Sequence, residues 1–163
     1  MNMSLSYRFL ACWLFLGALA LGEGRRIEVL FLGDKGHHKP EERVHELTEA
    51  LGPRGFNITY TENLDDLNRD YLARYDGLMI YANIGRLDPE KEQVLLDYVA
   101  SGKGLIPIHC ASYCFLNSKP YIALVGAQFK SHKTGVFTAE IVKPDHPAMK
   151  NVEPFEAWDE TYV

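Results

Sequence analysis

Residues 26–33 read RIEVLFLG, an almost continuous apolar run that ends in glycine. This composition is typical of a strand that is buried on both faces of a parallel sheet, because a half-exposed strand alternates between apolar and polar residues. Residues 76–83 (DGLMIYAN) and 104–109 (GLIPIH) have the same character. We therefore predict three neighbouring parallel strands that are fully buried, and Pro107 is the residue that fits such a strand least well.

Segments with helical periodicity separate these strands. Residues 41–52 place their apolar side chains on one helical face and end in glycine, and residues 89–101 do so behind an initial proline. A short helix is expected over 64–75, and a strand over 57–61 is expected to lie outside the first strand. This alternation predicts one α/β domain over residues 25–163, built on a doubly wound, mostly parallel sheet.

The pattern of apolar and polar residues changes beyond Gly126. Short strands are expected at 128–129, 135–142 and 157–163, joined by polar turns without an amphipathic helix between them. The chain stops inside the last of these segments. We therefore expect a domain that is truncated at its C-terminal end, in preference to a natural terminus.

The first 22 residues have the composition of a secretory signal peptide. Arg8 precedes an uncharged apolar run, and Ala18-Leu19-Ala20 supplies the small residues that signal peptidase accepts. The run is shorter than the ~20 residues that span a bilayer, which favours a cleaved signal over a membrane anchor. The expected protein is exported, periplasmic or secreted, and has no membrane attachment once residues 1–22 are removed.

The composition argues against several other classes. Hydrophobic residues make up 47% of the chain and charged residues 24%, as in globular domains. The net charge is −5 and no basic run is present, which argues against a nucleic-acid partner. Only Cys110 and Cys114 remain after signal removal, and two cysteines make no disulfide framework. An apolar core must therefore hold the fold.

Polar side chains gather at the carboxyl ends of the expected strands, where open parallel sheets bind ligands. Residues 37–38 follow the first strand, Asn83 follows the third, and His109 ends the fourth. Five of the six histidines lie outside the expected helices, namely His37, His38, His109, His132 and His146. We expect a shared cleft there, with its functional side chains within about 10 Å of one another.

Two kinds of ligand suit such a histidine cluster. Imidazoles can bind a divalent metal together with carboxylates such as Asp145 or Glu160, or they can hydrogen-bond a polyhydroxylated molecule. No pair of histidines has the spacing of a helical metal motif, which favours the second interpretation. No cofactor motif is evident, and a divalent metal bound by histidine stays open.

Cys110 and the aromatic residues also have two interpretations each. A cysteine at a strand-to-helix turn can act as a nucleophile beside an oxyanion-binding backbone, but cysteine is also a common core residue, and the core role is favoured. Aromatic rings near the cleft can stack on the apolar faces of sugars or pack the core. These rings belong to Tyr81, Tyr113, Phe115, Phe129, Trp158 and Tyr162.

Five motifs of the chain resemble, in order, those of ThuA-like (trehalose utilisation) domains. They are GDxxHH at 33–38, GLIPIHCAS at 104–112, FxxH at 129–132, DHP at 145–147 and WDETY at 158–162. The resemblance implies a class I glutamine amidotransferase-like fold, related to the flavodoxin-like arrangement. It also implies a role in the use of trehalose or other disaccharides, and an association with haem or sugar-dehydrogenase modules of larger exported bacterial proteins.

The resemblance also implies site residues, and it has one clear departure. The positions carried over are His109, His132, Asp145, His146, Asp159 and Glu160. In the related amidotransferases a glycine-rich sequence follows the elbow cysteine and a His-x-Glu pair lies downstream. Here Ala111-Ser112 follows Cys110 and the chain contains no His-x-Glu. Cysteine-dependent amide hydrolysis is therefore not implied.

Three functions stay open at this point. The leading hypothesis is an enzyme that acts on a sugar or an oxidised sugar, with His132 or Glu160 as general acid or base and His109 orienting the substrate. The second is a carbohydrate-binding or scaffold module without catalysis, and the third is a cysteine hydrolase. The candidate catalytic set is His109, His132, Glu160, Asp159 and Cys110, and the candidate substrate-binding set is His37, His38, Asn83, Asp145, His146 and Trp158.

Overall fold

The computed structural model describes residues 24–163, and its first four strands form one parallel sheet. The strands are β1 (Ile27–Leu32), β2 (Phe56–Thr61), β3 (Gly77–Ile80) and β4 (Gly104–Pro107). Their order across the sheet is β2-β1-β3-β4, and every neighbouring pair is parallel. This is the strand order of a flavodoxin-like sheet. The predicted fold class is confirmed, as is the position of the second strand outside the first.

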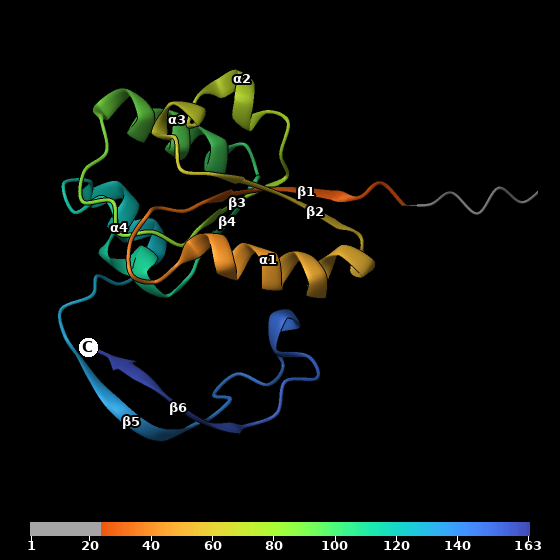
Figure 1. Ribbon diagram of the computed structural model, residues 1–163, viewed down its shortest axis with the longest axis vertical. Coiled ribbons are helices and arrows are strands. Elements are labelled where there is room, and N and C mark those ends of the chain that lie inside the picture. Colours follow the sequence, from red (N-terminus) through yellow and green to blue (C-terminus); the bar gives the residue numbers. More distant parts are fainter. Residues whose placement is uncertain (1–23) are drawn as a thin grey trace, which may run out of the picture.

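Helices cover both faces of this sheet. Helix α1 (Pro40–Leu51) lies on one face, and α2 (Arg69–Leu72) and α3 (Pro89–Ala100) lie on the other, as Figure 1 shows. Helix α4 (Lys119–Val125) packs into the same core as α3. The helix expected over 64–75 is instead a 3-10 turn followed by α2. It is broken because Asn68 accepts a hydrogen bond from the Tyr71 N–H (2.9 Å) and so begins a new helix.

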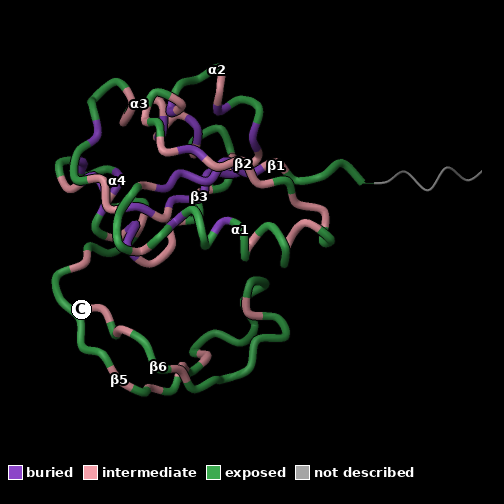
Figure 2. Tube along the Cα trace, viewed as in Figure 1, coloured by how far each residue is buried: buried purple, intermediate pink, exposed green. Residues whose placement is uncertain are grey.

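The core consists of two clusters that the sheet separates. Alternate side chains of β1 point to opposite faces, so that Val29 and Phe31 join a small cluster beneath α1, while Leu30 and Leu32 join a larger cluster beneath α2 and α3. None of the four is more than 3% exposed. Figure 2 shows the buried residues concentrated along these central strands. The continuous apolar run at the start of the domain is therefore explained by burial on both faces.

Strand β4 is less buried than predicted, and that part of the prediction is wrong. It is the last strand in the sheet order, with only β3 as a partner, and Ile106 is 37% exposed. The N–H groups of Gly104 and Ile108 donate to carbonyls on the β3 side. Pro107 lies at an odd position between them, so its missing N–H falls on the free edge, where proline is tolerated.

The C-terminal part forms a separate hairpin on the α1 side of the sheet (Figure 1). Strands β5 (His132–Ala139) and β6 (Phe155–Tyr162) pair antiparallel, with His132 opposite Tyr162. Two of the three strands expected here are thus present with shifted bounds. The strand expected at 128–129 is absent. This segment makes only one backbone hydrogen bond with the sheet domain, from the Phe129 N–H to the Ser112 carbonyl, and one bond does not form a strand pair.

The predicted signal peptide, residues 1–22, lies outside the described residues. Within residues 24–163, no helix is both long enough and apolar enough to cross a membrane.

Candidate functional site

The chain turns sharply where β4 ends. His109 has a positive φ of 47° and begins a 3-10 helix, His109–Tyr113. A non-glycine residue in this conformation is uncommon and must be held by its surroundings. The hydroxyl of Ser112 donates to the His109 carbonyl (3.0 Å), and the Ile108 N–H donates across to β3. The tip of the strand-to-helix turn is therefore His109 and not the residue that follows it.

Three histidines meet at this edge of the sheet. The ring of His38 lies 4.7 Å from that of His109 and perpendicular to it, and the rings of His37 and His38 lie 4.0 Å apart, centroid to centroid. Tyr81, which follows β3, lies 6.0 Å from both His38 and His109. The ends of three neighbouring strands thus bring together side chains that are far apart in the sequence, as expected.

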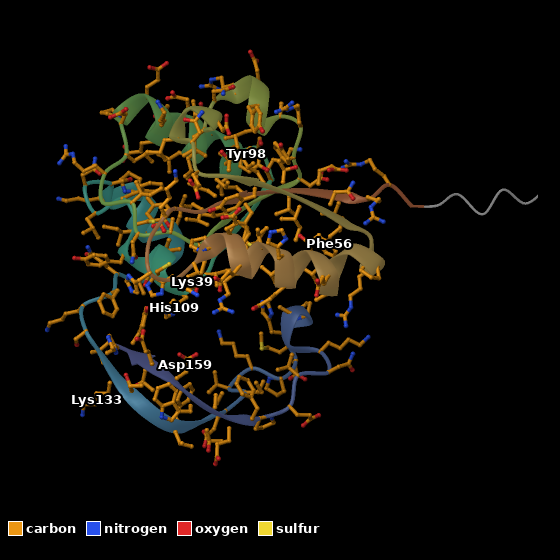
Figure 3. All side chains as sticks on the ribbon, in the orientation of Figure 1. Lys39, Phe56, Tyr98, His109, Lys133 and Asp159 are labelled. Carbon is orange, nitrogen blue, oxygen red and sulfur yellow. The ribbon has the colours of Figure 1, made fainter. Side chains whose placement is uncertain are left out.

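The hairpin contributes the opposite wall of the site. The Tyr162 hydroxyl lies 3.0 Å from Nε2 of His109, within hydrogen-bonding distance. The two carboxylate oxygens of Glu160 lie 3.8 Å from Nε2 of His109 and 3.7 Å from Nε2 of His132. Figure 3 shows His109 on the side of the sheet layer that faces the hairpin. One carboxylate thus lies between an imidazole of the body and an imidazole of the hairpin.

These groups enclose a cavity of about 340 Å³. Its lining combines aromatic residues, imidazoles, an amide, a cysteine and a carboxylate. The lining residues are His37, His38, Asn83, Cys110, Tyr113, Phe129, His132, Glu160 and Tyr162. We call this cavity the histidine cleft. Six of the predicted site residues line the cleft, and they come from the segments after β1, β3 and β4 and from the hairpin. His109 does not line the cleft but lies beside it, in contact with Tyr162.

A carboxylate at the end of β1 supports one wall of the histidine cleft. Asp34 accepts hydrogen bonds from the N–H groups of Gly36 (2.7 Å) and Asn83 (2.5 Å), and so ties the loop after β1 to the end of β3. The side-chain oxygen Oδ1 of Asn83 is buried and has no hydrogen-bond partner within the described residues. Buried acceptors are normally satisfied. The side-chain amide of Asn83 therefore has a hydrogen-bonding capacity that the described residues do not use.

Burial sets the protonation of several groups in the cleft. It lowers the pKa of His38 below its usual 6.5, and the neighbouring His37 and His109 lower it further. Burial, followed by the charge of Glu160, raises the pKa of the Tyr162 phenol well above its usual range. Tyr162 is therefore a neutral phenol, and His38 is predominantly neutral at physiological pH.

The two cysteines have the properties of core residues. Cys110 is 2% exposed, and burial raises the pKa of its thiol to about 12. Cys114 is fully buried and its Sγ lies 2.7 Å from the Ala82 carbonyl, to which it donates. A nucleophilic cysteine must ionise to the thiolate. These properties argue against catalysis by Cys110 and favour a structural role, although the thiol forms part of the cleft floor.

Four predicted site residues lie outside the histidine cleft. Trp158 is 72% exposed on the hairpin. Asp145 and His146 lie in the connection between β5 and β6, where Nδ1 of His146 accepts from the Ala148 N–H (3.1 Å) and caps a short 3-10 helix. Asp159 faces a neighbouring cavity of about 640 Å³ beside α1. Asp159 and Glu160 are consecutive strand residues, so their side chains leave β6 in opposite directions.

Among residues 24–163, no group of three or more His, Cys, Asp or Glu side chains is arranged so that it could hold a metal ion.

Tyr162 has a role in the site, as the partner of His109, that the sequence did not predict. It was expected only as one of several aromatic residues near the cleft. Strand periodicity could have identified it, because Glu160 and Tyr162 are two residues apart and so share one face of β6.

The fold and the site together define a class of protein, a flavodoxin-like α/β domain with a polar cleft at the carboxyl edge of its sheet. The chain belongs to the ThuA family, described as trehalose utilisation, whose profile matches residues 28–163.

Two solved structures share this fold. One is a ThuA-like protein from Bacteroides uniformis, with a TM-score of 0.70 and 18% identity over 86% of this chain and 62% of that one. The other, from Parabacteroides merdae, is also a ThuA-like protein and has a TM-score of 0.72 and 15% identity over 85% of this chain and 63% of that one. The chain therefore spans somewhat over three fifths of the length of each. A comparison with curated proteins found no match.

Proposed function

We propose that the protein binds a sugar, or an oxidised sugar derivative, in the histidine cleft and acts on it by acid–base chemistry. The observation that carries this proposal is the side-chain amide of Asn83, which belongs to the lining of the cleft and whose buried Oδ1 has no hydrogen-bond partner among the described residues. An unsatisfied buried acceptor costs about 1–3 kcal/mol. A ligand hydroxyl would remove that cost by donating to this oxygen once the amide turns to present it to the cleft.

The size and lining of the cleft support a small polyhydroxylated ligand. Its volume of about 340 Å³ lies within the range of ~300–1,000 Å³ that is typical of small-molecule sites. Phe129 lies 4.6 Å from Tyr162 and 5.6 Å from Tyr113, ring centroid to centroid. This aromatic cluster offers an apolar surface to the C–H face of a sugar ring, while the imidazoles and Asn83 offer hydrogen bonds to its hydroxyl groups.

The arrangement of Glu160 supports catalysis as well as binding. One of its oxygens lies near Nε2 of His132, which lines the cleft, and the other lies near Nε2 of His109, which adjoins the cleft. The carboxylate can accept a proton from one group while an imidazole gives one up to the ligand, which general acid–base catalysis requires. We assign His132 and Glu160 the acid and base roles and His109 the role of orienting the substrate.

A carbohydrate-binding module without catalysis is the second candidate. The cluster of Phe129, Tyr113 and Tyr162 favours it, because aromatic stacking and hydrogen bonds are sufficient for binding. The cysteine hydrolase is disfavoured by the burial and raised pKa of Cys110.

We also propose that the protein is exported and works beside haem or sugar-dehydrogenase modules. The proposal of export is based on the sequence of positions 1–22, in which a positive charge is followed by an apolar run and then by small residues. N-terminal sequencing of protein from the native host tests it. Export predicts a first residue near Leu21–Glu23, and retention of Met1 would count against it.

The proposed function is tested with a panel of disaccharides and their 3-keto derivatives, measured by calorimetry for binding and by product analysis for turnover. His132→Ala is expected to abolish turnover and weaken binding at little cost in stability, because this side chain is 39% exposed. His45→Ala, on the exposed side of α1, is the matched control and should behave like the wild type. If no sugar of the panel binds the wild type, or if both variants behave alike, the proposal is wrong.

A further inference from the structure

Tyr162 occupies a position in the histidine cleft that packing alone does not explain. Its ring lies on β6 and lines the cleft, and its hydroxyl lies 3.0 Å from Nε2 of His109, which adjoins the cleft. Glu160 is a second hydrogen-bond partner near this hydroxyl, and it contributes to the raised pKa of Tyr162. A phenol can donate one hydrogen bond and accept another. The direction of the bond to His109 therefore decides what the phenol can offer a ligand.

The charge of Glu160 favours one direction. Its carboxylate lies 3.8 Å from the same Nε2 atom of His109, and a negative charge at this distance stabilises a proton on that nitrogen. With the proton on Nε2, the imidazole donates and the Tyr162 oxygen accepts. The phenolic proton is then not used by His109 and is free for a second partner. Glu160 is the rival acceptor for this proton until a ligand oxygen enters the cleft.

We infer that Tyr162 is a further catalytic residue, whose phenol donates a hydrogen bond to a carbonyl oxygen of an oxidised sugar while His109 holds the phenol in place from behind. The inference rests on the proposed function and makes its substrate class more specific. A neutral donor fixed in position stabilises an oxygen that is polarised or gains negative charge during a reaction. A carbonyl oxygen is such an atom, whereas the hydroxyl group of an unoxidised sugar develops no comparable charge. The raised pKa of Tyr162 keeps the donor protonated throughout the neutral range.

The first test compares two ligands, trehalose and its 3-keto derivative, on three proteins. The wild type should bind the keto sugar more tightly, and Tyr162→Phe should lower that affinity about tenfold while changing the affinity for trehalose less. Tyr98→Phe is the matched control. It also removes one phenolic hydrogen bond, to the Tyr75 carbonyl (3.2 Å), but on α3 at the other face of the sheet. It should bind both sugars as the wild type does.

The second test needs neither a ligand nor a variant. Nitrogen-15 NMR of the wild-type protein reports which ring nitrogen of His109 carries the proton, and Nε2–H is expected. A proton only on Nδ1 would overturn the inference, because the phenol must then donate to His109. This measurement also decides the matter if Tyr162→Phe does not fold.

The outcomes separate this inference from the proposed function. If the wild type binds sugars but Tyr162→Phe retains the full preference for the keto sugar, the inference alone fails. If the wild type binds no sugar at all, both fail.

Discussion

Oε1 of Glu160 lies 3.7 Å from Nε2 of His132, across the two strands of the hairpin. His132 faces Tyr162 in the strand register, so Glu160 and His132 are diagonal neighbours on one face of the ladder. The hairpin therefore presents a neighbouring carboxylate and imidazole to the sheet edge. This relationship allows a test that distinguishes an enzyme from a binding module.

Glu160→Gln keeps the shape of the side chain and removes its charge. If Glu160 is a general base, the variant should lose turnover by about 100-fold or more while its Kd for the sugar changes only a few-fold. Its Tm should change little, because a partly exposed ion pair contributes only about 0–1 kcal/mol. Steady-state kinetics, calorimetry and thermal unfolding measure the three quantities. Unchanged turnover would rule out Glu160 as the base, whereas binding of the sugar by the wild type without any turnover would leave the module as the better assignment.

Cys110 should resist alkylation in the folded protein. Its thiol is 2% exposed and has a pKa of about 12, so the thiolate is scarce at pH 8. Iodoacetamide followed by mass spectrometry should show little labelling of Cys110 without denaturant and complete labelling in its presence. Cys110→Ala should retain most of the activity. Rapid labelling of the native protein, or loss of turnover in a folded Cys110→Ala variant, would revive the cysteine hydrolase.

His38 should make the protein less stable as the pH falls. Burial lowers its folded pKa below the unfolded value of 6.5, so the unfolded state binds more protons between these two values. Stability is therefore present above pH 6.5 and is lost as the pH falls from 6.5 towards the folded pKa. Melting curves between pH 7.5 and 5 should show a smaller decrease in Tm for His38→Gln than for the wild type. His45→Gln, on an exposed face of α1, should keep the wild-type slope, and an equal slope in all three proteins would contradict the prediction.

The fold could be predicted best from the sequence where a strand is buried on both of its faces. Strands β1 and β3 consist of continuous apolar runs because both of their faces are covered, and the two long helices have clear apolar faces. Strand β4 has the same composition, but composition does not reveal how many neighbours a strand has. The 37% exposure of Ile106 depends on the sheet order, which is a long-range property.

The candidate site was harder to predict than the fold, for two physical reasons. The side chain at the tip of the turn depends on a backbone conformation, the positive φ of His109, which no local pattern of residues required. In the WDETY motif, strand alternation puts Trp158 and Tyr162 on the same face of the strand. It does not show which of the two side chains reaches the cleft, because that depends on where the hairpin lies against the sheet. Trp158 is 72% exposed, whereas Tyr162 contacts His109.

Gly33, at the end of β1, is required for a steric reason. A Cβ at this position would lie 2.5 Å from the ring of Tyr60 and 2.7 Å from Cβ of Pro40. Pro40 is buried at the start of α1, and the Tyr60 hydroxyl donates to Glu62 (2.9 Å), so neither neighbour can move freely. Gly33→Ala should therefore destabilise the domain by about 1–3 kcal/mol, the usual cost of overpacking.

Chemical denaturation measures this effect, with Gly135→Ala as the control. Gly135 lies in β5, and a Cβ there would meet no atom within 4 Å, so its substitution should change the free energy of unfolding by no more than about 0.5 kcal/mol. A second substitution, Tyr60→Ala, removes the ring that the new methyl group meets. The cost of Gly33→Ala should therefore be smaller in the Tyr60→Ala background than in the wild type. If the cost is the same in both backgrounds, the contact with Tyr60 is not its cause, and a stable Gly33→Ala protein would show that the loop after β1 can shift away from the sheet.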